Sequence, residues 1–213
     1  MLVSISTMPA GENYLKYVKQ VEQHADFMHL DVCDGKYNET TCFSAEFAKD
    51  INFHSTIALD CHLMTCDPIL HAKNYIKSGV NIVTAQFEAF KNKADIIDFV
   101  HFVTLNNTLV GLSLEPETSV NQILQFLPML NVVLIMAVKT GKSGQKFDES
   151  SVKKIEMLAK LRSEQNLCFK IEVDGGINSN NAKLVKSAGA DIVVSGNYVY
   201  LSQDKEQAIS SLR

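Results

Sequence analysis

Short apolar segments alternate with amphipathic segments along the whole 213-residue chain. Eight segments rich in β-branched and other apolar residues are predicted to be strands: Leu2–Ser6, Phe27–Cys33, Thr56–Met64, Asn81–Phe87, Thr108–Leu114, Val132–Val138, Cys168–Asp174 and Asp191–Ser195. They are mostly continuously apolar rather than alternating, which is typical of parallel strands buried on both faces. The pattern indicates an α/β fold with a parallel sheet and right-handed crossovers.

The segments between these strands carry the signals of helices. Apolar residues recur at three- and four-residue intervals, as at Ile155, Leu158 and Leu161 within Ser150–Gln165. The same spacing recurs at Tyr14, Val18 and Val21. Candidate N-caps are Asp148 or Ser150 for one helix and Asn178 or Ser179 for another. Gly79 and Gly189 stand at or near helix ends. Eight intervening or trailing helices are therefore expected.

A closed barrel and an open doubly wound sheet both fit this alternation. No GxGxxG motif follows the first predicted strand, which disfavours a dinucleotide-binding sheet. We see no linker or low-complexity segment. We therefore expect residues 1–213 to form a single (β/α)₈ TIM barrel domain with a closed eight-stranded parallel sheet.

Composition narrows the possible partners and the compartment. The formal net charge is −4 with no dominant basic face, so neither nucleic acid nor a membrane is expected as a partner. The longest apolar run, Val132–Val138, is too short to span a bilayer. The five cysteines form no CxxC pair and no signal peptide precedes them, so a cytoplasmic location with free thiols is expected.

Four polar residues stand at predicted strand ends, where barrel enzymes gather their active sites. His29 and Asp31 alternate on the second strand and so point to the same side, while His62 and Asp174 end the third and seventh strands. Each residue alone could be a core histidine or a turn-forming aspartate. Together they suit Zn²⁺, Fe²⁺, Mn²⁺ or Co²⁺.

Glycines follow three consecutive strands, at Gly141 and Gly144, at Gly175-Gly176 and at Gly196. Ordinary turn chemistry explains any one cluster. Glycine also lets backbone N–H groups approach an anion closely, and the loops after strands seven and eight often bind phosphate in such barrels. The three clusters together predict a phosphate site.

Sulfur-containing side chains are expected near the same end of the barrel. Cys33, Met64 and Met136 all lie close to strand ends. Their soft side chains could pack around a planar, delocalised intermediate. Core packing is the simpler explanation for any one of them.

Six stretches of the sequence resemble the ribulose-phosphate 3-epimerase family, and the resemblance covers nearly the whole chain: Val3–Ser6, His29–Gly35, Leu59–Met64, Gly144–Phe147, Ile171–Ile177 and Ala188–Asp191. The order H-x-D-x-x-D-G, D-x-H-L-M and E-V-D-G-G is specific to the family. Allulose-6-phosphate 3-epimerase is a close relative that shares the L-D-C-H-L-M form found here.

The resemblance implies a metal-dependent sugar-phosphate 3-epimerase on a (β/α)₈ barrel. The metal would be held by His29, Asp31, His62 and Asp174, and Asp31 and Asp174 would be the acid/base pair that inverts carbon 3. The substrate would lie near Ser4, His62, Met64, Met136, Gly141, Ser143, Gly144, Gly175, Gly176, Gly196 and Asn197. Family relatives are often oligomers, so a homo-oligomer is expected.

The chain departs from the family in its substrate-facing loops. The usual N-P-G-F-G-G-Q is here Lys139–Gln145, and the segment after D-G is Lys36–Thr40. Other substitutions are Gln86 for His, Cys33 for Met, Glu115 for Asn and Asn197 for Ser. These changes put the identity of the sugar phosphate, and turnover itself, in question more than the reaction type.

Two other classes remain as alternatives. Relatives of orotidine-phosphate decarboxylase and hexulose-phosphate synthase share the architecture but carry D-x-K-x-x-D, and this chain has Val32 in place of that lysine. A non-catalytic paralogue that binds a sugar phosphate would explain the altered loops. The intact set of four ligands disfavours it.

Overall fold

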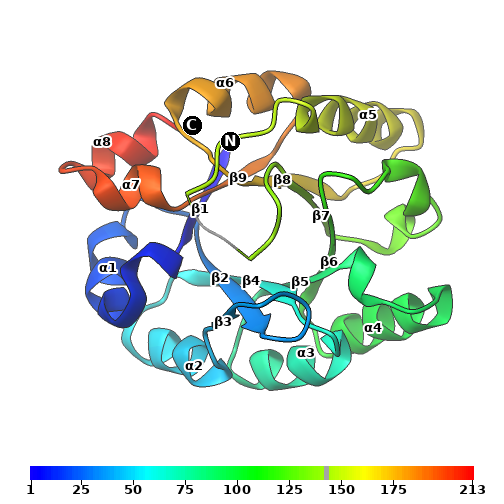
Figure 1. Ribbon diagram of the computed structural model, residues 1–213, viewed down its shortest axis with the longest axis horizontal. Coiled ribbons are helices and arrows are strands. Elements are labelled where there is room, and N and C mark those ends of the chain that lie inside the picture. The colour runs from blue at the N-terminus through cyan, green and yellow to red at the C-terminus, as the bar shows by residue number, and fades with distance from the viewer. Residues whose placement is uncertain (142–143) are drawn as a thin grey trace.

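Eight parallel strands form a closed barrel in the computed structural model, which describes residues 1–141 and 144–213. The strands are β1 (Leu2–Ser6), β2 (Phe27–Asp34), β4 (Ala58–Met64), β5 (Ile82–Gln86), β6 (Leu109–Leu114), β7 (Val132–Met136), β8 (Lys170–Asp174) and β9 (Ile192–Ser195). β1 pairs with both β9 and β2, so the sheet has no open edge in this ring (Figure 1). The eight predicted strands are confirmed, with ends that differ by at most two residues.

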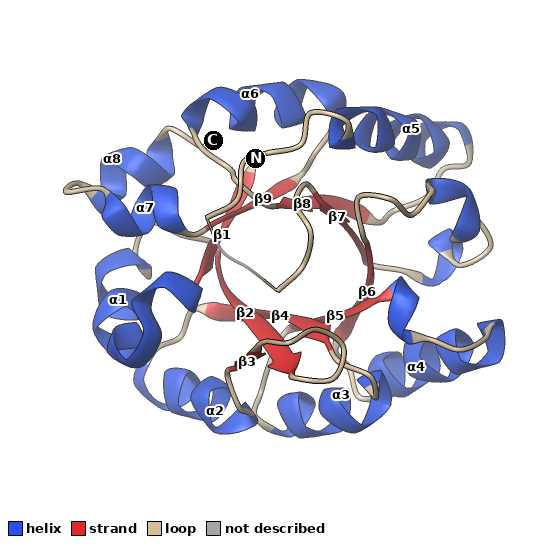
Figure 2. Cartoon of the chain, in the orientation of Figure 1, coloured by secondary structure: helices blue, strands red, loops and turns tan. Residues whose placement is uncertain are grey.

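Helices form an outer ring around the barrel (Figure 2). They are α1 (Tyr14–Val21), α2 (Ala45–His54), α3 (Pro68–Lys77), α4 (Lys93–Leu105), α5 (Ser151–Glu164), α6 (Ser179–Ala188), α7 (Asn197–Leu201) and α8 (Lys205–Ser210). The α6 boundaries follow the predicted signals, since the Asn178 side chain accepts hydrogen bonds at its start and Gly189 ends it with φ +111°. Ser150 occupies the N-cap of α5, although its side chain makes no capping bond.

Two connections differ from the expected pattern. No α-helix lies between β6 and β7; this segment contains the 3₁₀ turns η3 (Val120–Gln122) and η4 (Leu127–Met129) instead. Pro128 within η4 cannot donate a backbone hydrogen bond, which works against a continuous helix. The short strand β3 (Thr41–Cys42) was not predicted, and it pairs antiparallel with the end of β2.

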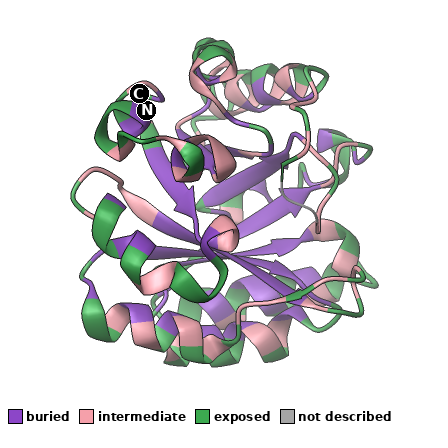
Figure 3. Ribbon diagram, turned by 60° about the vertical axis from the view of Figure 1, so that its left-hand side comes forward, coloured by how far each residue is buried: buried purple, intermediate pink, exposed green. Residues whose placement is uncertain are grey.

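The strands separate two kinds of side chain. Alternate residues such as Val3, Ile5, Leu30 and Leu63 belong to the apolar core, and the helices turn their exposed faces outward (Figure 3). The intervening residues face the barrel interior. Many of these are polar and fully buried: Ser4, His29, Asp60, His62, Thr84, Gln86, Ser113 and Glu172. A polar barrel interior therefore leads to the ends of the strands where the candidate site lies.

No helix within residues 1–141 and 144–213 combines the length and the apolar character that crossing a membrane requires.

Candidate active site

The barrel brings together four polar residues from three strands. The register pairs Asp31 on β2 with His62 on β4, and His29 lies two residues earlier on the same face of β2. Asp174 ends β8, which closure of the barrel places near β2 although the two strands are not paired. One ligand atom from each of the four residues lies within 4.8 Å of the others. The predicted grouping of these side chains is thus present.

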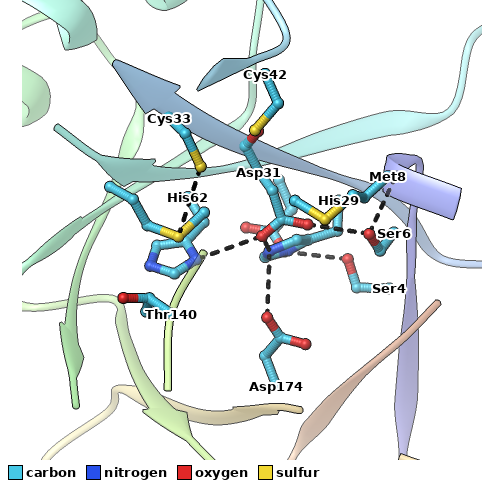
Figure 4. Close-up of polar contacts among 12 residues, drawn as sticks. Ser4, Ser6, Met8, His29, Asp31, Cys33, Cys42, His62, Thr140 and Asp174 are labelled. Atoms are coloured by element: carbon cyan, nitrogen blue, oxygen red, sulfur yellow. Dashed lines mark hydrogen bonds and ion pairs between the residues drawn. The ribbon is translucent and has the colours of Figure 1, made fainter. Parts of the chain in front are cut away.

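The nitrogen and oxygen atoms of this group surround a common space (Figure 4). His29 Nε2 lies 3.4 Å from Asp31 Oδ1 and 4.0 Å from Asp174 Oδ2, and His62 Nδ1 lies 3.7 Å from Asp31 Oδ1. Within the described residues, His29 Nε2 and both His62 ring nitrogens are buried without a hydrogen-bond partner. A divalent cation would give His29 Nε2 and one of the His62 nitrogens the partner they lack, so the donor set fits a metal.

A second layer of polar residues lies below His29. Its Nδ1 is 2.7 Å from Asp60 Oδ2, and the Ser4 hydroxyl donates to the same oxygen at 3.0 Å. In the neutral imidazole, a carboxylate that accepts from Nδ1 keeps the proton on that atom, so Nε2 is free and directed toward Asp31 and Asp174. Glu172 completes a buried group with His29 and Asp60.

The two aspartates of the site differ in acidity. Burial works against ionisation of Asp31, but the charge and hydrogen bonds of His29 and His62 outweigh it and hold its pKa well below the usual range. Burial, followed by the negative charge of Asp31, raises the pKa of Asp174 from 3.8 to about 6. In the absence of a metal, Asp31 is thus ionised over a pH range in which Asp174 still holds its proton.

Asp60 and Glu172, the buried carboxyl groups below the site, also differ in acidity. Burial and the charge of Asp60 raise the pKa of Glu172 well above its ordinary value. Burial opposes ionisation of Asp60 as well, but His29 lowers the pKa of that carboxyl. A neutral Glu172 next to an ionised Asp60 therefore limits the negative charge held in the barrel interior.

A cavity of about 320 Å³ opens above the four-residue group. It is lined by Asp31 and Asp174 and by most of the residues predicted to contact substrate: Met64, Met136, Gly141, Gly144, Gly175, Gly176, Gly196 and Asn197. Two predicted residues, Ser4 and His62, are fully buried and do not line it. Ser143 lies outside the described residues, as does Lys142.

The glycines on this wall allow close backbone approach. A Cβ atom on Gly176, whose φ is +65°, would lie 2.5 Å from the Phe147 backbone nitrogen. A side chain at this position would therefore force apart the loops that follow β7 and β8. Gly176 thus lets the loops after β7 and β8 pack directly against each other, and both loops line the cavity.

Hydrogen bonds connect the loop after β7 with the loops that follow β2 and β6. Thr140 donates hydrogen bonds from its side chain and its backbone N–H to the Glu115 carboxylate, and Tyr37 donates to the same carboxylate at 3.3 Å. The Thr40 hydroxyl donates to the Gly141 carbonyl at 2.7 Å. Residues from the substituted segments thus contact one another at the rim of the cavity.

Several residues in and below the site were not predicted. Ser6 lines the cavity and donates to Asp31 Oδ2 at 3.0 Å. Asp60 and Glu172 lie two residues before His62 and Asp174, so the alternation that was applied to His29 and Asp31 also places them inside the barrel. This alternation was the signal available for both.

A closed barrel with two carboxylates and two imidazoles at the C-terminal ends of its strands, next to a glycine-lined cavity, places the protein among the TIM-barrel enzymes that act on small molecules. Within that class, this chain belongs to the ribulose-phosphate 3-epimerase family, whose sequence profile matches residues 3–200. The chain is thus an isomerase, a sugar-phosphate epimerase.

Similar sequences occur in bacteria and plants. A ribulose-phosphate 3-epimerase of Mycobacterium leprae is 30% identical over 212 residues, which cover 100% of this chain and 93% of the relative. A chloroplastic ribulose-5-phosphate-3-epimerase of Arabidopsis thaliana is 32% identical over 217 residues, covering 100% of this chain and 76% of the relative. The match therefore extends over the barrel from end to end.

Solved structures confirm the fold. A 3-hexulose-6-phosphate synthase superposes with a TM-score of 0.72 at 18% identity, covering 100% of this chain and 98% of the other. The orotidine 5'-phosphate decarboxylase from Pyrococcus horikoshii gives a TM-score of 0.70 at 13% identity, with coverages of 99% and 97%. At these identities the likeness concerns architecture alone.

Proposed function

We propose that the chain inverts carbon 3 of a ketose phosphate, of the ribulose 5-phosphate to xylulose 5-phosphate type. Epimerisation next to a carbonyl removes a proton from one face of the carbon and returns a proton to the other face. The single observation that carries the proposal is the pair Asp31 and Asp174, which line the same cavity from different strands with pKa values displaced in opposite directions.

In this mechanism Asp31 and Asp174 alternate as base and acid at carbon 3. One carboxylate accepts the proton, and the other carboxyl group donates from the opposite face. Ser6 orients Asp31 through its 3.0 Å hydrogen bond. A turnover needs one ionised and one protonated partner at its start, and in the metal-free protein Asp174 is the weaker acid of the two.

We propose that His29, Asp31, His62 and Asp174 hold a divalent metal, for which Zn²⁺, Fe²⁺, Mn²⁺ and Co²⁺ are all suitable. When bound, such an ion would supply Lewis-acid stabilisation of the negative charge that develops on the substrate oxygens. Asp60 fixes the orientation of the His29 ring through the bond to Nδ1.

Backbone groups around Gly144, Gly175, Gly176, Gly196 and Asn197 would bind the phosphate, since all five residues line the cavity. Met64 and Met136, on other parts of the cavity wall, would pack against the flat, delocalised form of the sugar. Binding the phosphate at a distance from carbon 3 orients the reacting carbon between the two carboxyl groups.

The test is proton-to-deuterium exchange in D₂O, followed by NMR. Zn²⁺-loaded protein would be mixed separately with D-ribulose 5-phosphate, D-xylulose 5-phosphate and D-allulose 6-phosphate. Exchange at carbon 3 of one of them is expected, and Asp31→Asn or Asp174→Asn should slow it by at least about 100-fold. Asp98→Asn, on the exposed face of α4, is the matched control.

Two outcomes would contradict the proposal. Retained exchange in either active-site variant would remove that aspartate from the acid/base pair. Absence of exchange with all three sugars, in protein that binds both the metal and inorganic phosphate, would favour a binding paralogue.

A further inference from the structure

Cys33 and Cys42 face each other across the antiparallel pair formed by β2 and β3. Side chains of directly opposed residues project from the same face of such a pair, with Cα atoms about 4.5 to 5.5 Å apart. This separation falls within the range of about 4.4 to 6.8 Å that disulfide bonds span. Both residues are free thiols in the structure.

A second cavity gives access to this pair. It has a volume of about 470 Å³ and is lined by both cysteines together with residues of α3, including His71 and Tyr75. Its lining shares no residue with that of the substrate cavity. A small oxidant can therefore reach the two thiols without passing through the substrate site.

Both thiols contact the walls of the substrate cavity. The Cys42 thiol donates to the Asp31 carbonyl oxygen at 2.9 Å (Figure 4). The Cys33 sulfur lies 4.0 Å from the Met64 sulfur. Asn38 also donates to the Cys33 sulfur at 3.8 Å. A bond between the two sulfurs would remove the thiol donor to Asp31 and draw Cys33 away from Met64.

The strand that carries Cys42 lies outside the eight-stranded ring. β3 has two residues and pairs only with β2. The next residue, Phe43, has a φ of +41°, which is unfavourable for a bulky side chain. Adjustment at Cys42 therefore leaves the eight-stranded ring in place.

We propose that Cys33 and Cys42 are a redox-reactive pair that a hydroperoxide converts into a reversible disulfide bond. One of the two sulfurs attacks a peroxide oxygen, the O–O bond breaks, and a sulfenic acid and water or an alcohol are formed. The other sulfur then attacks the sulfenic sulfur and displaces the hydroxyl group, which leaves as water with the proton of the attacking thiol. Two thiols are oxidised by two electrons and one peroxide is reduced.

The test treats the Zn²⁺-loaded full chain with hydrogen peroxide, because Zn²⁺ has no redox chemistry of its own. The intact mass should fall by two hydrogen atoms. Trypsin cleaves after Lys36, between the two cysteines, so their peptides should remain joined until dithiothreitol is added. Cys42→Ser, which keeps a hydroxyl donor toward Asp31, should prevent the cross-link and retain turnover.

The control replaces the exposed cysteines Cys66 and Cys168 by serine and should form the cross-link as before. Cross-linked protein should turn over at least about tenfold more slowly, with recovery on reduction, because small displacements near Asp31 are costly to catalysis. This kinetic readout rests on the proposed function, whereas the mass readout needs no substrate. A different cysteine pairing, oxidation of Cys33 without a cross-link, or unchanged turnover of cross-linked protein would overturn the proposal.

Discussion

The imidazole of His29 is held from below by the carboxylate of Asp60, with 2.7 Å between Nδ1 and Oδ2. Ser4 donates to the same carboxylate oxygen. The arrangement fixes the ring in one tautomer and directs Nε2 toward the other candidate ligands.

Replacing Asp60 by Asn should therefore weaken metal binding. An amide cannot supply the negative charge that favours a proton on Nδ1, so the affinity for Zn²⁺ should fall about 10- to 100-fold. Competition with a chromophoric chelator measures this directly. Asp98→Asn should leave the affinity unchanged, and an equal affinity in Asp60→Asn would show that Asp60 does not position His29.

Asp174 gives the metal-free protein a specific pH dependence. Its pKa is raised from 3.8 to about 6 by burial and by Asp31. A carboxyl group with a higher pKa in the folded state stabilises that state while protonated, so its contribution is complete below about pH 4 and is lost as the pH rises through about 6. Urea unfolding of wild type and Asp174→Asn across this range should show the wild type losing stability relative to the variant. A constant difference between them would contradict the shift.

Glu115 should affect substrate binding by positioning Thr140. Glu115→Ala removes the acceptor for both Thr140 hydrogen bonds and for Tyr37. Because a hydrogen bond to a charged group contributes about 1.5 to 3 kcal/mol, the KM should rise roughly tenfold or more, with a smaller change in kcat. Steady-state kinetics on Glu115→Ala, Thr140→Val and the double variant should show non-additive losses.

The neighbouring Glu117 is exposed and provides the control for that series. Glu117→Ala should keep wild-type kinetics. Additive effects of Glu115→Ala and Thr140→Val would mean that the two residues act independently.

Gly111 on β6 leaves room for a side chain on β5. Thr84 on β5 is paired with Gly111 across the sheet. A Cβ atom added to Gly111 would lie 2.4 Å from Thr84 Oγ1. Gly111→Ala should therefore lower the free energy of unfolding by about 1 to 3 kcal/mol, as overpacked interiors usually do. Chemical denaturation measures the change, and Thr84→Ala in the same chain should recover part of it. An unchanged stability would mean that the interior relaxes around the new methyl group.

The sequence contains enough local information to predict the strands and the four-residue group. Strand segments such as Val132–Met136 are continuously apolar, and the alternation of His29 with Asp31 fixes the direction of both side chains. Because the active sites of such barrels form at the C-terminal ends of the strands, polar residues at those ends are expected to lie together.

Contacts between segments that are far apart in the sequence could not be predicted from local patterns. The pairing of Thr140 with Glu115 depends on the paths of two loops, and β3 is too short to show a periodic pattern. The absence of an α-helix between β6 and β7 in the described chain reflects tertiary packing of Val120, Ile123 and Leu127 as much as local preference. Asp60 and Glu172 could have been found, because the same two-residue alternation applies to them.

The position of β1 between β2 and β9 also gives the molecule an order of assembly during synthesis. A growing chain offers β1 its partner β2 early, but β9 is made only after the other seven strands of the ring. Until then the sheet has two unpaired edges, and Asp31 has no fixed relation to Asp174. Closure of the ring is therefore a late step, and it is the step that brings the four proposed metal ligands together.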